Sequence, residues 1–124
     1  MIDPGDVAAV AAVALTADGH EGQTYLLTGP ETITYERVAE VLSAVAGRSI
    51  GFVAVSDEAA RQGLIGAGMP EFVAEQLVTL FGLLRRGTHE RTTGAVRVLT
   101  GREPRTFARF AHDHAGLFQA YATT

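Results

Sequence analysis

The sequence of 124 residues contains no cysteine and no lysine. The absence of cysteine excludes disulfide bonds, thiolate nucleophiles, and zinc or iron–sulfur sites built on cysteine. The absence of lysine excludes a Schiff base, the lysine of a P-loop, and a tyrosine–lysine pair for hydride transfer. All ten basic residues are arginines, and together with the abundance of alanine, glycine and valine this indicates a GC-rich bacterial genome.

The chain also lacks an excess of positive charge and a long apolar run. Its net charge of −4 argues against a nucleic-acid partner, because proteins that bind nucleic acids usually carry a basic face. No apolar stretch approaches the ~20 residues that span a bilayer. The apolar segment 7–15 is short and follows Asp3 and Asp6 instead of a basic leader. We therefore expect a cytoplasmic protein without a membrane partner, folded as a single domain over residues 1–124.

Two segments with strand character, residues 24–28 and 50–55, flank a predicted helix that Thr34 caps and Gly47 ends. A strand, a crossover helix and a second strand predict a parallel β-α-β unit. The expected fold class is α+β and mostly helical, with five to six helices around this unit. The other helices are predicted over residues 6–17, 57–65, 70–86, 94–100 and 106–121, with Asp6, Ser56 and Thr106 as N-caps and Pro70 as a first helical residue.

The turn Thr28-Gly29-Pro30 is the best-placed candidate for lining a substrate pocket. It follows the carboxyl end of a predicted strand, where α/β proteins bind ligands, although ordinary turn chemistry also explains it. Tyr35 and Phe81 are further pocket candidates, and their helical spacing fits a role in the core equally well. Four arginines either meet an anionic ligand or a carboxylate or lie in solvent; these are Arg85, Arg86, Arg102 and Arg105.

No group of residues predicts a catalytic or metal site. The histidines have no ligand spacing of a known type; they are His20, His89, His112 and His114. The acidic pairs Asp3/Asp6 and Asp57/Glu58 fit helix N-termini, where carboxylates accept hydrogen bonds from free N–H groups. We expect neither a catalytic residue nor a metal in this chain.

Three stretches together resemble one family of proteins. They are GDVAAVAAVALTADGHEGQTYLLTGPETITYERVAEVLSAVAGRSIGFVAV at 5–55, GMPEFVAEQLVTLFGLLRRG at 68–87, and LTGREPRTFARFAHDHAG at 99–116. In this order and spacing they are similar to the C-terminal portion of NmrA-like proteins, atypical members of the short-chain dehydrogenase superfamily. The resemblance covers nearly the whole chain. It implies that these residues correspond to the part of the family's proteins that closes over the substrate.

The nucleotide-binding half of that family has no counterpart in these residues. The family implies NADP or NAD for the full-length protein, held by a Gly-rich turn between a strand and a helix. The sequence has no such turn; Gly63, Gly66 and Gly68 are closely spaced but follow a helical pattern. We therefore expect no cofactor to bind this chain alone.

Two functions remain open at this point. The first is the substrate-side domain of a truncated or split NAD(P)-binding protein, without redox catalysis by itself and completed by a separate nucleotide-binding half. Such an assembly would be an NAD(P)-dependent oxidoreductase-like or redox-sensing protein. The second is a stand-alone, non-enzymatic module that forms a homodimer and binds a small apolar ligand, because apolar faces that pack on the missing half would otherwise be exposed.

Overall fold

The computed structural model describes residues 1–88 and 90–119, which form two compact units. One unit combines Met1–Phe52 with the segment from Thr92 onward, and the other is Val53–Arg91. The described residues contain seven helices, which are α1 (Pro4–Thr16), α2 (Tyr35–Ala46), α3 (Asp57–Gly66), α4 (Glu71–Arg85), α5 (Ala95–Thr100), α6 (Phe107–Asp113) and α7 (Ala115–Gln119). None of the described helices is long and apolar enough to cross a membrane.

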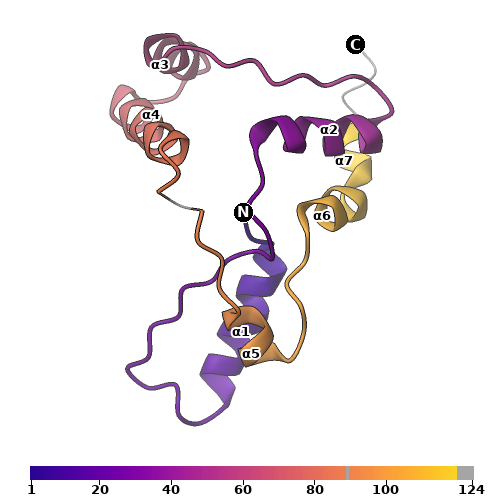
Figure 1. Ribbon diagram of the computed structural model, residues 1–124. Coiled ribbons are helices and arrows are strands. Elements are labelled where there is room, and N and C mark those ends of the chain that lie inside the picture. Colours follow the sequence, from indigo (N-terminus) through magenta and orange to yellow (C-terminus); the bar gives the residue numbers. More distant parts are fainter. Residues whose placement is uncertain (89, 120–124) are drawn as a thin grey trace. The chain divides into compact units, whose positions relative to one another are not determined.

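In the first unit, α1 packs against α5, and α2 packs against α6 and α7 (Figure 1). Val10 and Val96 are buried in the first of these packed groups, and Ala39 and Ala111 are buried in the second. An alanine at a buried position lets two helix backbones approach closely, because it fills little space between them. The first unit therefore has a small core built mainly from valine and alanine.

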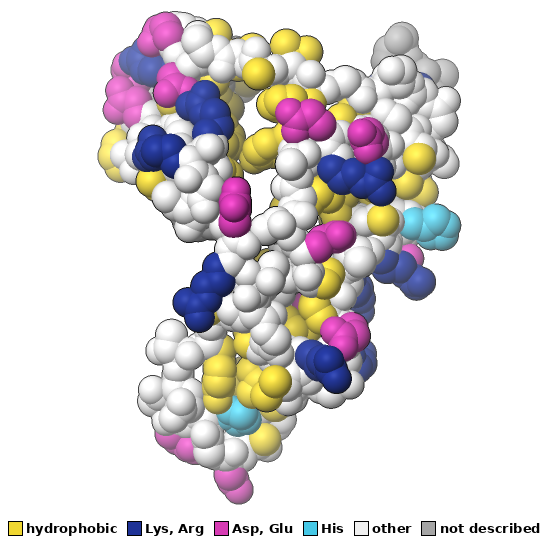
Figure 2. All heavy atoms as spheres, viewed as in Figure 1, with side chains coloured by type: hydrophobic (Ala, Val, Ile, Leu, Met, Phe, Trp, Pro, Cys, Tyr) yellow, Lys and Arg dark blue, Asp and Glu magenta, His cyan; other side chains and the backbone are white. Residues whose placement is uncertain are grey.

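The second unit is a pair of helices, α3 and α4, with Ala74 fully buried. Arg61 on α3 forms ion pairs with Glu71 and Glu75 on α4, and its side chain is only 25% exposed. Arg85 forms a second link to Asp57. Figure 2 shows arginine and acidic side chains lying together over α3 and α4. Arg85 therefore has a carboxylate partner, one of the two predicted alternatives, while its side chain remains 56% exposed to solvent.

Most predicted helix ends are confirmed by the backbone geometry. The hydroxyls of Thr34, Ser56 and Thr106 each accept a hydrogen bond from the backbone N–H three residues later, at 3.2, 3.2 and 3.1 Å. Gly47 ends α2 with φ 67°, a left-handed conformation that glycine adopts without a steric penalty. These ends were predictable because capping depends on only a few neighbouring residues.

The predicted β-α-β unit is wrong for the residues that the structure describes. Residues 24–28 and 50–55 are not helical, but they form no sheet with each other or with another described segment. Thr93 hydrogen-bonds the first segment through side chains, to the carbonyl of Leu26 and the hydroxyl of Thr28. Ser43 holds the backbone of Ile50 in the second. A β-sheet needs two strands joined by backbone hydrogen bonds, and strand propensity in one segment does not provide the second strand.

Three predicted helix details also need correction. Asp3, not Asp6, caps α1, which begins at Pro4; Asp6 is buried instead. Pro70 precedes α4 as its N-cap and is not its first helical residue. The last predicted helix is divided at His114 into α6 and α7, and its residues 120–121 lie outside the described part of the chain, as does His89.

Candidate ligand-binding cleft

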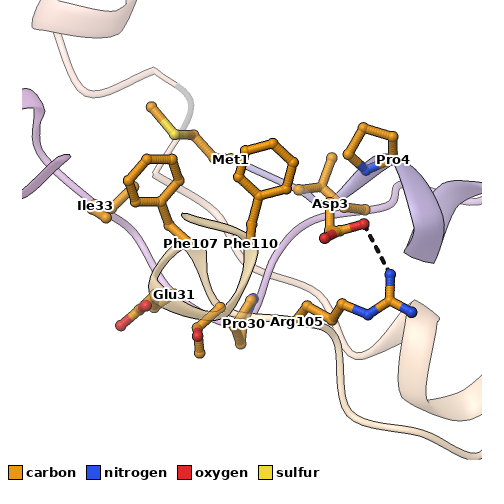
Figure 3. A pocket seen from close by; sticks show the side chains of 11 residues that line it. Met1, Asp3, Pro4, Pro30, Glu31, Ile33, Arg105, Phe107 and Phe110 are labelled. Carbon is orange, nitrogen blue, oxygen red and sulfur yellow. Dashed lines mark hydrogen bonds and ion pairs between the residues drawn. The ribbon is translucent and has the colours of Figure 1, made fainter. Parts of the chain in front are cut away.

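Three segments distant in the sequence meet around a cleft of about 420 Å³ in the first unit (Figure 3). They are the N-terminal segment before α1, the turn that follows Thr28, and the start of α6. The lining residues are Met1, Ile2, Asp3, Pro4, Pro30, Glu31, Ile33, Arg105, Thr106, Phe107 and Phe110. A concave site with many apolar and a few polar side chains has the general composition of a small-molecule site.

Two phenyl rings form the aromatic part of the cleft. Phe107 and Phe110 lie one turn apart on α6, with ring centroids 6.2 Å apart and an interplanar angle of 29°. Figure 3 shows both rings near the side chain of Met1, with Ile33 beside Phe107. Thr106 caps α6 and so fixes where the helix begins, which places the two rings in the cleft. A flat apolar ligand can stack against such a surface.

An ion pair marks the polar end of the cleft. Arg105 Nη1 lies 3.1 Å from Asp3 Oδ1, and the same carboxylate oxygen accepts the backbone N–H of Gly5 at 2.6 Å. The Asp3 side chain is only 8% exposed, whereas that of Arg105 is 44% exposed. The carboxylate is therefore held by the protein, while part of the guanidinium faces solvent.

Asp6 fixes the backbone beneath this ion pair. Its side chain is buried, and its Oδ2 accepts the backbone N–H of Arg105 at 2.7 Å. This bond joins the first turn of α1 to the residue that precedes the cap of α6. Hydrogen bonds to an ionised acceptor are stronger than those between neutral groups. Asp6 thus positions Arg105 although the carboxylate does not line the cleft.

Gly29 fixes the turn that follows Thr28. It is buried, and its N–H donates to the carbonyl of Met1 at 3.0 Å. The preceding Thr28 accepts the N–H of Thr93 at 2.8 Å. These two bonds fix the turn that carries Pro30 and Glu31 into the cleft.

The structure brings together only part of the predicted pocket. Pro30 lines the cleft, and Thr28 and Gly29 hold its backbone without lining it. Tyr35 instead stacks on Phe52, with ring centroids 5.8 Å apart. Phe81 lies on α4, in the other compact unit. Whether any of these residues contacts a substrate stays a prediction.

No pattern in the sequence indicates Asp3 as a pocket residue. The helical spacing of Phe107 and Phe110 favours the core, with a ligand pocket as the alternative, and Arg105 is one of four candidate arginines. The segment GREPRTF at 101–107 belongs to one of the stretches that resemble the family, and it carries Arg105 and Phe107 of the cleft. Since its partners lie about a hundred residues earlier in the sequence, no local pattern indicated the cleft. The predicted carboxylate partner of Arg105 is confirmed by Asp3.

The charges on α6 are paired along the helix. Arg109 Nε donates to Asp113 Oδ2 at 2.8 Å, and this hydrogen bond lowers the pKa of the Asp113 carboxyl below its ordinary value. Both residues lie away from the set that lines the cleft. They stabilise the helix that carries the two phenyl rings, as opposite charges four residues apart do.

The turn at 28–30 does not fit the phosphates of a dinucleotide. A phosphate site needs several free backbone N–H groups at a Gly-rich turn, and the N–H of Gly29 is already used by Met1. No group of three or more potential metal ligands exists in the described part of the chain. The mostly apolar lining of the cleft suits an apolar or aromatic molecule.

Comparisons with known proteins show that the chain is similar to part of several reductases. It is 44% identical over 119 residues to an NAD(P)H azoreductase from Xenophilus azovorans, covering 96% of this chain and 42% of that protein. It is 41% identical over 117 residues to a (4-alkanoyl-5-oxo-2,5-dihydrofuran-3-yl)methyl phosphate reductase from Streptomyces griseus, covering 94% and 41%. The chain thus spans about two fifths of the length of these relatives. No family model matches the sequence.

Solved structures agree with this assignment. The crystal structure of the Citrobacter sp. triphenylmethane reductase with NADP(H) matches with a TM-score of 0.80 and 28% identity, over 92% of this chain and 39% of that one. An NADPH-dependent quinone oxidoreductase from Escherichia coli matches with a TM-score of 0.81 and 25% identity, over 94% and 42%. The fold is therefore that of the C-terminal part of NAD(P)-dependent reductases. The chain belongs to the NmrA-like NAD(P)-binding family and corresponds to the C-terminal portion of its members.

Proposed function

We propose that this chain is the substrate-side part of an NAD(P)H-dependent reductase and that its cleft forms one wall of the substrate site. The observation that supports this most directly is the pair of phenyl rings beside an ion pair in a cleft of about 420 Å³. The part of the protein that binds NADP or NAD lies outside these residues, either in the same polypeptide or in a separate partner.

The proposed substrate is a small conjugated organic molecule that accepts electrons. The relatives are named for reducing azo compounds, triphenylmethane dyes and quinones. Such molecules are largely flat and apolar, and stacking on aromatic side chains in a water-poor site makes their free energy of binding more favourable. The chain's role in this proposal is to bind and orient the substrate, with no redox catalysis by itself.

A calorimetric titration with NADPH tests whether the cofactor binds outside these residues. The chain of 124 residues is expected to show no saturable binding, because the turn at Gly29 offers no free phosphate site. A conjugated aromatic molecule such as quinoline is expected to shift the NMR signals of Phe107 and Phe110. Tight NADPH binding by this chain would contradict the placement of cofactor recognition elsewhere, and unchanged Phe signals would contradict the substrate role of the cleft.

A homodimeric, non-enzymatic module remains a second proposal, and the surface of α4 supports it. Phe72 is 71% exposed, Val73 41% and Leu80 41%, so α4 carries exposed apolar side chains. Exposed apolar surface of this kind favours association. Light scattering at micromolar concentration is expected to give twice the monomer mass for the wild type and the monomer mass for Phe72→Ser. A monomeric wild type at that concentration would refute this alternative.

A further inference from the structure

We infer that Glu31 makes the cleft selective for a flat aromatic ligand that carries a positive charge. This inference rests on the proposed function, because it specifies the substrate class of the same cleft. The charges of the lining residues carry it. Among the side chains that line the cleft, two are carboxylates, Asp3 and Glu31, and one is a guanidinium, Arg105, so the side-chain charges sum to −1.

The two carboxylates are not equivalent. Asp3 is paired with Arg105 at 3.1 Å and also accepts the N–H of Gly5, so its charge is already compensated. Glu31 is exposed and forms no ion pair with any residue in 1–88 or 90–119. Figure 3 shows Glu31 and Arg105 on opposite sides of Pro30, with the Asp3 carboxylate turned toward Arg105. The uncompensated side-chain charge of the cleft therefore lies at Glu31.

The aromatic walls, like Glu31, favour a positively charged ligand. The faces of Phe107 and Phe110 carry negative electrostatic potential, which attracts a cation that lies over the ring. The net charge of −4 over the whole chain adds a weaker attraction of the same sign. An anion gains little from Arg105, because Asp3 already neutralises that guanidinium. A delocalised aromatic cation satisfies both the rings and Glu31.

Three bicyclic aromatic probes of similar size distinguish the possibilities in neutral buffer at low salt. They are the cation N-methylquinolinium, the neutral quinoline and the anion naphthalenesulfonate. The full chain is titrated with each while the NMR signals of Phe107 and Phe110 are followed. We expect the cation to bind most tightly. Glu31→Gln is expected to weaken it about two- to fivefold, the range of a partly exposed charge pair, and to leave quinoline unchanged.

Glu21→Gln is the matched control, since Glu21 is exposed in the same compact unit but does not line the cleft. It removes the same charge and is expected to leave the preference intact, whereas high salt is expected to reduce it. Equal binding of all three probes, or an unchanged preference in Glu31→Gln, would overturn the role of Glu31 while the substrate cleft stands. If none of the probes shifts the phenylalanine signals, the proposed substrate cleft itself fails.

Discussion

Replacing Gly29 with alanine will lower the free energy of unfolding by about 1–3 kcal/mol, the range for overpacking a buried position. Gly29 is buried, and a methyl group there would overlap the carbonyl oxygen of Met1. The backbone must move apart to accept it, which also breaks the hydrogen bond from Gly29 N–H to that carbonyl. Urea denaturation followed by circular dichroism measures the loss.

The same substitution will open the cleft, because Met1 and Pro30 line it from the two segments that this hydrogen bond joins. Gly51→Ala is the control: Gly51 lies in the same unit, a methyl group there meets no atom within 4 Å, and its φ is not positive. It is expected to change stability by less than about 0.5 kcal/mol, as surface substitutions do. A Gly29→Ala protein as stable as Gly51→Ala would show that the contact with Met1 is unimportant.

The helices were predictable because their signals are local. Thr34 and Gly47 lie at the two ends of α2, and the structure confirms both. Ser56 likewise begins α3. A cap depends on hydrogen bonds within one turn, so neighbouring residues contain nearly all the information needed. The same reasoning failed for Asp6, because a second acidic residue three positions earlier could also cap the helix.

The extended segments and the cleft depend on partners far away in the sequence. Residues 24–28 have strand propensity, but Thr93 meets them through side chains and supplies no backbone ladder. The cleft likewise needs Arg105 beside Asp3, a pairing across about a hundred residues. Strand propensity describes how a residue fits a sheet surface, not whether a sheet exists. The turn 28–30 was a pocket candidate because it follows a predicted strand; that strand does not form, and of the three residues only Pro30 lines the cleft.

Replacing Asp6 with alanine will lower the free energy of unfolding by about 2–3 kcal/mol, the upper range for a hydrogen bond to a charged group. Asp6 is only 7% exposed, and its Oδ2 is 2.7 Å from the backbone nitrogen of Arg105. Alanine leaves that N–H without its acceptor and leaves a space beside α1. Because Arg105 is released, the ion pair with Asp3 weakens and the polar end of the cleft loses its geometry.

Asp6→Asn separates the two contributions of this carboxylate, since the amide oxygen can still accept the Arg105 N–H but carries no charge. We expect it to recover about half of the loss in urea denaturation, because a neutral hydrogen bond is roughly half as strong as a charge-assisted one. Asp18→Ala removes an exposed acidic residue of the same unit and is expected to change stability by less than about 0.5 kcal/mol. If Asp6→Ala were no less stable than Asp18→Ala, the link from α1 to α6 would have to lie elsewhere. The joint loss of stability and of aromatic-probe binding in Asp6→Ala, with both partly restored in Asp6→Asn, would instead show that this buried carboxylate builds the cleft by positioning Arg105.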